Sequence, residues 1–248
     1  MSDMVLYHNP RWGKSRGAVS LLKEKNIDFI IIEYLKTPLT EDKQRSPKDP
    51  FPISNVASEY DLANFAKNSK LYEISIKYYS EILKELDNQS NLYAKILYRR
   101  GGSYERIGNY KKADDDLLNS LNINSNDPYV MNYLGYSWLE RNINIKEAFI
   151  LLEKANKKKK DDPYITDSIG WAYYLTGNFN KAEKFLRKAV LLMPDDPIVN
   201  DHYGDILWKL NRKIEARYFW KSVLKLEETD AEMRNKIKQK LIIGLEDA

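Results

Sequence analysis

The stretch DSIGWAYYLTGNFNKAEKFLRKAVLLMP, residues 167–194, decides the fold of most of this 248-residue chain. Apolar and small residues recur in it at three- and four-residue steps, as at Ala182, Phe185 and Ala189, which is the spacing of a buried face on a helix. The polar segment TGN, residues 176–178, divides the stretch into two halves. The stretch therefore predicts two consecutive helices that pack against each other.

The same arrangement repeats along the last three quarters of the chain. The dipeptide Asp-Pro occurs at residues 127–128, 162–163 and 196–197, at intervals of 35 and 34 residues. Asp before Pro favours a helix start, because the carboxylate caps free backbone amides and Pro is tolerated at the first helical position. Self-similarity at this period indicates an array of stacked two-helix units.

Small residues recur at fixed offsets within these units, and two antiparallel helices can cross closely only where side chains are small. We therefore expect these positions to form the contacts between the helices. In the first helix of each unit they are Ala63, Gly101, Gly135, Gly170 and Gly204. In the second helix they are Ser75, Ala113, Ala148, Ala182 and Ala216, followed seven residues later by Ile82, Ser120, Ala155, Ala189 and Val223.

Residues 167–194 resemble a tetratricopeptide repeat (TPR), whose pattern is matched by Ile169, Gly170, Tyr173, Gly177, Phe179, Ala182, Ala189 and Pro194. The resemblance implies a mainly α fold, a superhelix (α-solenoid) over residues 56–248. About five helical hairpins begin near Val56, Ala94, Pro128, Pro163 and Pro197, and a capping helix spans about 230–243. The segments DSIGWAYYL, NDHYGDILW and EARYFW further resemble the closing repeats of long bacterial TPR proteins.

The TPR resemblance also implies a binding site, because members of the family bind a peptide or a partner helix in a concave groove lined by the first helices. The register of the family selects Tyr98, Glu105, Tyr129, Asn132, Tyr136, Tyr164, Asp167, Trp171, Tyr174, Asp201, Asp205 and Trp208. Such an aromatic and acidic groove favours a peptide with Lys or Arg beside apolar anchors. The alternative is that the aromatic residues pack between helices. Lys236, Lys238 and Lys240 are expected on the outer face of the capping helix.

The N-terminal residues 1–44 predict a strand, a helix over 14–25 and a second strand in DFIIIEYL, which is the start of a βαβ unit. With the loop YHNPRWGKSRG they resemble the opening of the arsenate reductase family and its Spx relatives, which are thioredoxin-like. That family carries a catalytic cysteine where this chain has Trp12. The surviving Lys14, Ser15 and Arg16 leave weak anion binding at this helix start as a hypothesis.

Composition excludes several kinds of chemistry. The chain has no cysteine and two histidines, so thiolate catalysis and disulfides are excluded, and we expect neither a metal nor a cofactor. A net charge of +4 does not indicate nucleic acid. No apolar run approaches the roughly 20 residues of a membrane span, and we expect a cytoplasmic protein. A P-loop is rejected because His8 occupies the place of its first glycine.

These observations predict a non-enzymatic scaffold or adaptor that binds a protein or peptide. The alternatives are a degenerate arsenate reductase-like or glutaredoxin-like oxidoreductase, and an assembly factor that self-associates as a homo-oligomer. A Pro-rich linker over residues 45–55 is expected to join the fragment to the array. The fragment is too small to be stable alone, so three hypotheses stay open: docking on the first repeat, pairing with another copy, or a fusion without function.

Overall fold

The computed structural model describes residues 5–7, 30–32 and 55–245, with the side chains of the helical part described from residue 59 onward. The chain divides into two compact units, residues 1–53 and 54–248. Each unit is described by itself.

In the first unit, strands β1 (Val5–Tyr7) and β2 (Ile30–Ile32) pair in parallel, with Val5 opposite Ile30 and Tyr7 opposite Ile32. Parallel strands need a crossover connection, which agrees with the predicted βαβ order. The predicted helix over 14–25, with Trp12 and the anion-binding candidates before and within it, lies outside the described residues. A thioredoxin-like fold is therefore not established, and most of the predicted linker also lies outside them.

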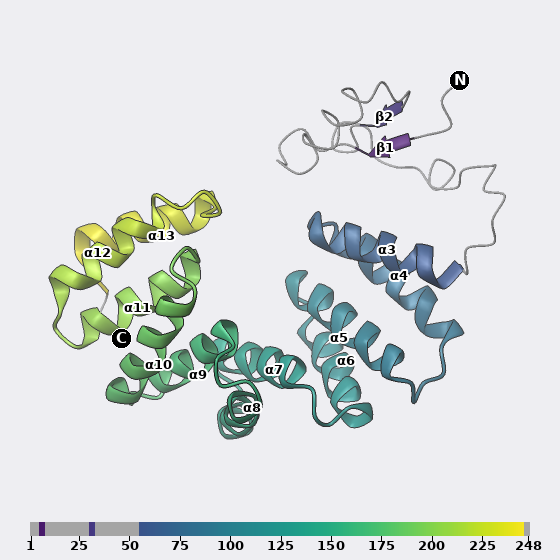
Figure 1. Cartoon of the computed structure of the whole chain (residues 1–248), viewed down its shortest axis with the longest axis horizontal. Helices are drawn as coiled ribbons and strands as arrows, with labels where there is room; N and C mark the ends of the chain where they lie inside the picture. The colour runs from purple at the N-terminus through teal and green to yellow at the C-terminus, as the bar shows by residue number, and fades with distance from the viewer. Residues whose placement is uncertain (1–4, 8–29, 33–54, 246–248) are drawn as a thin grey trace. The chain divides into compact units, whose positions relative to one another are not determined.

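The second unit contains eleven α-helices within residues 55–245, which follow one another as hairpins (Figure 1). The pairs are α3 (Asn55–Asn68) with α4 (Tyr72–Glu85), α5 (Asn91–Arg106) with α6 (Tyr110–Ile123), α7 (Pro128–Glu140) with α8 (Ile145–Lys158), α9 (Pro163–Leu175) with α10 (Phe179–Leu192), and α11 (Pro197–Lys209) with α12 (Lys213–Val223). Helix α13 (Ala231–Ile243) ends the array. The predicted five hairpins and capping helix are confirmed.

The Asp-Pro dipeptides start helices for the reason expected. The carboxylate of Asp127 accepts hydrogen bonds from the backbone amides of Tyr129 and Val130, and Asp196 accepts them from Ile198 and Val199. Asp162 does the same for Ile165, and Pro stands at the beginning of each of these helices. Capping by the carboxylate and the preset backbone of Pro thus fix where α7, α9 and α11 begin.

A left-handed residue closes the turn inside each hairpin. Gly108 has φ +76° and Gly177 has φ +77°, a conformation that glycine adopts without steric strain. The other three hairpins use Lys70, Asn142 and Asn211 at the equivalent place, all with positive φ. A left-handed residue thus occurs in all five turns although only two of them carry glycine, and the turn between α7 and α8 is one residue longer, with a second positive φ at Asn144.

The recurring small residues lie where the two helices of a hairpin touch. A Cβ added to Gly170 would lie 2.8 Å from the side chain of Leu186, and one added to Gly204 would collide with the indole of Trp220. The small residues of the second helices, from Ser75 to Ala216, are buried. The sequence prediction of close helix crossings is confirmed.

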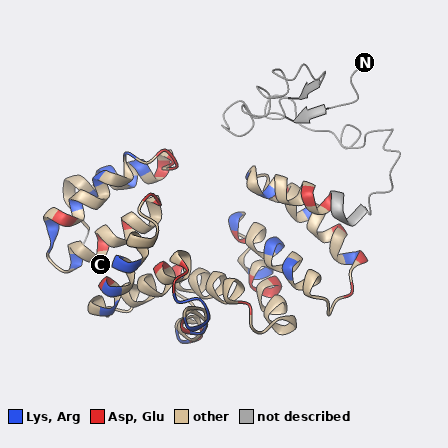
Figure 2. Cartoon of the chain, in the orientation of Figure 1, with Lys and Arg blue, Asp and Glu red and all other residues tan. Residues whose placement is uncertain are grey.

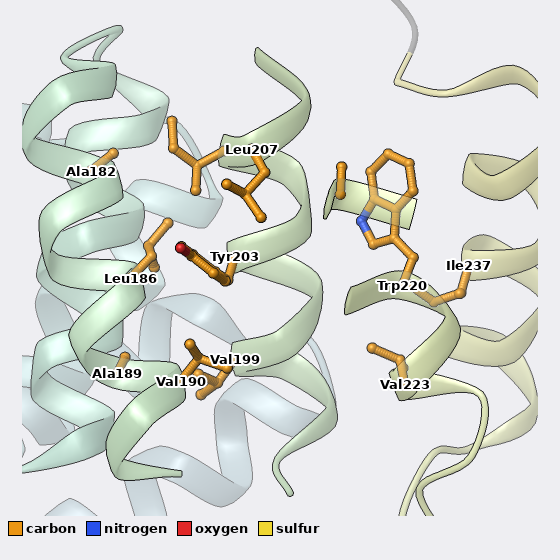
Figure 3. Close-up of a cluster of buried hydrophobic side chains, with 12 residues drawn as sticks. Ala182, Leu186, Ala189, Val190, Val199, Tyr203, Leu207, Trp220, Val223 and Ile237 are labelled. Atoms are coloured by element: carbon orange, nitrogen blue, oxygen red, sulfur yellow. The ribbon is translucent and has the colours of Figure 1, made fainter. Parts of the chain in front are cut away.

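Adjacent hairpins share their cores. Helix α10 packs on α11 and α12 packs on α13, while α9 also contacts α7 and α11, so the first helices α7, α9 and α11 form a continuous inner layer. Figure 3 shows the C-terminal core, in which Leu186, Tyr203, Leu207, Trp220 and Ile237 come from α10 to α13. Each hairpin thus buries its apolar face only by stacking on its neighbours. Among the described helices, none is both long enough and apolar enough to cross a bilayer.

Candidate binding site

A cleft of about 540 Å³ lies on the inner layer, between the first helices of consecutive repeats. It is lined by Glu105, Arg106, Tyr110, Asn132, Tyr133, Tyr136, Ser137, Glu140, Arg141, Tyr164, Asp167, Ser168, Asp196, Ile198 and Val199. These residues come mainly from α5, α7, α9 and the start of α11. Helix α7 contributes several of them and carries a single charged residue, Glu140, so it is almost uncoloured in Figure 2.

Five of the predicted groove residues meet in this cleft, namely Glu105, Asn132, Tyr136, Tyr164 and Asp167. Tyr164 is the most open of them, with 60% of its surface exposed. Five of the side chains that the family register selects therefore lie around one cavity.

Two acceptor atoms of the cleft lack a donor. Asn132 Oδ1 and Asp167 Oδ1 are buried and have no hydrogen-bond partner among the described residues. The other carboxylate oxygen of Asp167, Oδ2, lies 2.8 Å from Nδ1 of His202. The Asp167 side chain is 8% exposed, so its free oxygen gains little from solvent.

Three stacked rings form the wall between α9 and α11. The indole of Trp171 stacks on His202, with centroids 3.9 Å apart, and on Tyr174, with centroids 4.5 Å apart. Nε1 of Trp171 donates a hydrogen bond of 2.6 Å to Glu140 on α7. Trp171 and Tyr174 therefore pack mainly against neighbouring rings, as the packing alternative expected, and neither lines the cleft.

His202 and Tyr136 have shifted pKa values because of where they lie. Burial lowers the pKa of His202, but the Asp167 carboxylate, helped by Asp201 and Asp205, outweighs burial and raises it above its ordinary value. Burial, together with Glu140 and Asp167, raises the pKa of Tyr136. The Tyr136 hydroxyl thus keeps its proton at neutral pH and is available as a donor.

At the C-terminal end, two predicted groove residues are already paired. The ammonium group of Lys240, on α13, lies 2.5 Å from Asp201 Oδ1 and 2.6 Å from Asp205 Oδ1, and all three side chains are buried. The expectation that Lys240 lies on the outer face of the capping helix is wrong. Lys240 points inward because the two buried carboxylates on α11 require a counter-charge. Lys236 and Lys238 are exposed as expected.

Burial and the neighbouring Asp201 raise the pKa of Asp205 to about 6, against the opposing influence of Lys240. Nε1 of Trp220 also donates a 3.0 Å hydrogen bond to Asp205. This cluster is a packed polar core under α13, and it does not line the cleft.

The remaining predicted groove residues lie outside the cleft. Tyr98 packs edge-on against Tyr133, with centroids 5.8 Å apart. Tyr129 is exposed at the start of α7. Trp208 packs against Trp220 on α12, beneath the cations of Lys213 and Arg217.

Some residues of the cleft were not among the predicted ones, although the family register, which takes the second, fifth, ninth, twelfth and thirteenth residues of each unit, contained a signal for three of them. Arg106 and Glu140 are the thirteenth residues of the units that begin at Ala94 and Pro128, and Ile198 is the second residue of the unit that begins at Pro197. Applied to every unit, the same register would have selected all three. Tyr133 follows no such rule; its hydroxyl donates a 3.0 Å hydrogen bond to Glu105 on α5, and this contact between α7 and α5 brings it to the cleft.

Comparison with known proteins agrees with the helical array. The family model described as tetratricopeptide repeat matches residues 94–127 and 167–196. TPR repeat-containing protein PA4667 of Pseudomonas aeruginosa is 30% identical over 164 residues, which cover 66% of this chain and 26% of that protein. A crystal structure of a thermophilic TPR protein from Thermus thermophilus has a TM-score of 0.64 at 18% identity, covering 76% of this chain and all of that one.

A second, short similarity concerns a different family. A putative arsenate reductase of Neisseria gonorrhoeae is 53% identical over 38 residues, which cover 15% of this chain and 37% of that protein. The chain thus spans about a quarter of the first curated relative and little more than a third of the second. The hairpins, their caps, the family matches and the structural likeness agree: residues 94–127 and 167–196 match tetratricopeptide repeats, and residues 55–245 have the fold of an array of such repeats.

Proposed function

We propose that this chain is a protein-interaction scaffold that holds an extended peptide or a helix of a partner protein in the cleft between α5, α7, α9 and α11. TPR arrays bind protein partners, and the inner layer here offers an aromatic and polar cavity. The observation that carries the proposal is the cleft of about 540 Å³, in which five residues of the predicted groove converge.

The side chains of the cleft suit peptide recognition. Tyr133, Tyr136 and Tyr164 supply rigid aromatic surface, which gives contact area at a low cost in conformational entropy. Glu105 and Asp167 supply acceptors between these rings. The lining therefore combines apolar anchoring with polar selection, as peptide-binding grooves do.

The oxidoreductase alternative has less support. The short similarity to arsenate reductases brings no thiol, because the chain contains no cysteine to attack arsenic or a disulfide. We infer that the scaffold has no catalytic role of its own.

The test compares two exposed tyrosines in the full chain. A library of N-acetylated random dodecapeptides is presented to the wild type, to Tyr164→Ala and to Tyr218→Ala. Tyr164 lines the cleft and is 60% exposed, whereas Tyr218 on α12 is 67% exposed and is not part of the cleft lining. We expect Tyr164→Ala to weaken binding of the selected peptides about tenfold, and Tyr218→Ala to leave it unchanged.

Both variants should unfold within about 0.5 kcal/mol of the wild type, because both side chains are largely exposed. Absence of any peptide bound above background would overturn the proposal. Equal binding by the two variants would also overturn it, since the cleft would then not be the binding site.

A further inference from the structure

Three equivalent positions of the array hold an acceptor side chain on the inner layer. Asn132, Asp167 and Asp201 are each the fifth residue of the unit that begins at Pro128, Pro163 or Pro197. The repeat geometry therefore places the same kind of atom at the same point of α7, α9 and α11. What differs between the three positions is the donor that each one meets.

At Asp201 the donor is a lysine of the same chain. The Lys240 ammonium group contacts Asp201 and Asp205 at 2.5 and 2.6 Å, with its side chain buried at 8% exposure. The inner layer of this array thus already binds one lysine ammonium group, whose Nζ also lies 5.8 Å from the centroid of the Trp220 ring.

At Asp167 and Asn132 the corresponding donor is missing. Asp167 uses Oδ2 for His202, and its buried Oδ1 has no partner among the described residues; Asn132 Oδ1 is in the same condition. A buried acceptor left without a donor destabilises the fold, and more so when the acceptor is charged. Both side chains line the cleft, so a ligand there could supply the donor.

The charges around the cleft favour a cation. Its acidic members are Glu105, Glu140, Asp167 and Asp196, and its basic members are Arg106 and Arg141. The guanidinium of Arg141 is already engaged by the carboxylate of Asp114, at 2.6 and 3.1 Å. The side chain of Arg106 is 61% exposed. The tyrosines of the lining would cover the methylene stem of a long cationic side chain.

We propose that Asp167 and Asn132 form a subsite for the ammonium group of a lysine side chain in the bound peptide, in the manner in which Asp201 and Asp205 bind Lys240. The proposal rests on the proposed function, because the lysine belongs to the peptide that occupies the cleft. It assigns the middle of the inner layer a ligand chemistry, and it makes Asp167 the residue that selects it.

The test uses the dodecapeptide library with one central position fixed as lysine or as norleucine, which has the same carbon chain without the ammonium group. All peptides are N-acetylated, so that no terminal ammonium group competes. We expect the full-length wild type to retain lysine peptides about tenfold better than norleucine peptides, and Asp167→Asn to abolish that preference. Asp115→Asn, an exposed position on α6, is the matched control for the loss of one negative charge and should keep the preference.

Asn132→Ala serves as a second variant that leaves the Asp167–His202 contact in place, and it should reduce the lysine preference by severalfold. Peptides bound without a lysine preference, or a preference retained in both Asp167→Asn and Asn132→Ala, would overturn this inference and leave the proposed function standing. No peptide bound at all would overturn the proposed function itself. Thermal unfolding of each variant confirms that the array is folded before binding is compared.

Discussion

Equivalent positions of the repeat have different surroundings in the middle of the inner layer and at its C-terminal end. At the end, Asp201 and Asp205 lie beneath α13 and are neutralised by Lys240. In the middle, Asn132 and Asp167 border a cleft that no described helix fills. The same position of the repeat is thus part of the packed core where the capping helix covers it, and it is accessible to a ligand where no described helix covers it.

This difference explains why the capping helix belongs to the array. Ile237 of α13 is fully buried in the C-terminal core, and its neighbour one turn on, Lys240, supplies the counter-charge for α11. A capping helix must cover the last apolar face of a solenoid. Here α13 also covers and neutralises two carboxylates of α11 that would otherwise attract cations.

The largest effect is expected from removing that counter-charge. Lys240→Met leaves Asp205 buried without a cation and Asp201 with only the exposed Lys236 ammonium group, 3.9 Å away, and we expect the free energy of unfolding to fall by about 3–5 kcal/mol, measured by urea denaturation. Lys238→Met, on the exposed face of the same helix, is the control and should change it by less than about 0.5 kcal/mol.

A rescue variant sharpens this result. Adding Asp201→Asn and Asp205→Asn to Lys240→Met removes the unpaired charges and should restore at least half of the lost stability, because the cost lies in the buried charge more than in the missing contact. A loss of under about 1 kcal/mol in Lys240→Met would contradict the description of this end as a packed ionic core.

The next effect concerns how tightly the two regions are packed. Gly204→Ala places a methyl group against the indole of Trp220, and we expect a loss of about 1–3 kcal/mol from overpacking. In Gly102→Ala, on α5, the atoms nearest to the methyl group are the end of the flexible Lys67 side chain at 3.3 Å and the hydroxyl end of Tyr133, with Oη at 3.4 Å and Cζ at 3.5 Å.

In the Gly102 variant the better helix propensity of alanine, worth about 0.5–1 kcal/mol, should offset the local crowding. Its free energy of unfolding should therefore equal or exceed that of the wild type. Equal losses in the two variants would show that the cleft side is as tightly packed as the C-terminal core. Thermal unfolding followed by circular dichroism measures both.

The sequence predicted the array well because its signals are local and repeated. The carboxylates of Asp127, Asp162 and Asp196 cap the helices that follow them, and the small residues lie at the helix crossings. The helix starts and the crossings could therefore be predicted from residues that are close together in the sequence. The start of α5 at Asn91, three residues before the expected Ala94, lacks an Asp-Pro and is capped by Ser90 instead.

The binding residues were harder to predict because they depend on which helix covers which. Asp201 and Asp167 follow the same register, yet only the position of α13 decides that one is paired with a lysine. Lys240 itself has no sequence signal that separates it from Lys236 and Lys238. Likewise His202 reaches Asp167 across two helices, 35 residues apart in the chain.

The smallest effect is the pH dependence that His202 imparts to the boundary between the two regions. Its imidazole contacts the carboxylate of Asp167 and the ring of Trp171, both of which belong to α9. Asp201 and Asp205 lie near it on its own helix, α11, and these two carboxylates bind Lys240 of α13. Burial lowers the pKa of His202 and the carboxylates raise it, so the net shift of the pKa is the difference between two opposing effects. The contribution of His202 to the unfolding free energy should therefore be smaller than the loss expected for Lys240→Met.

Folding raises the pKa of His202 above 6.5, so the folded state binds its proton more tightly than the unfolded state. The stabilisation is therefore complete below pH 6.5 and is lost as the pH rises through the pKa of the folded state. We expect the difference in unfolding free energy between wild type and His202→Gln to shrink over that window. A difference independent of pH would contradict the ion pair with Asp167.

Because neutral His202 no longer offsets the charge of Asp167, the lysine preference of the cleft should increase over the same window, and it should stay constant with pH in His202→Gln.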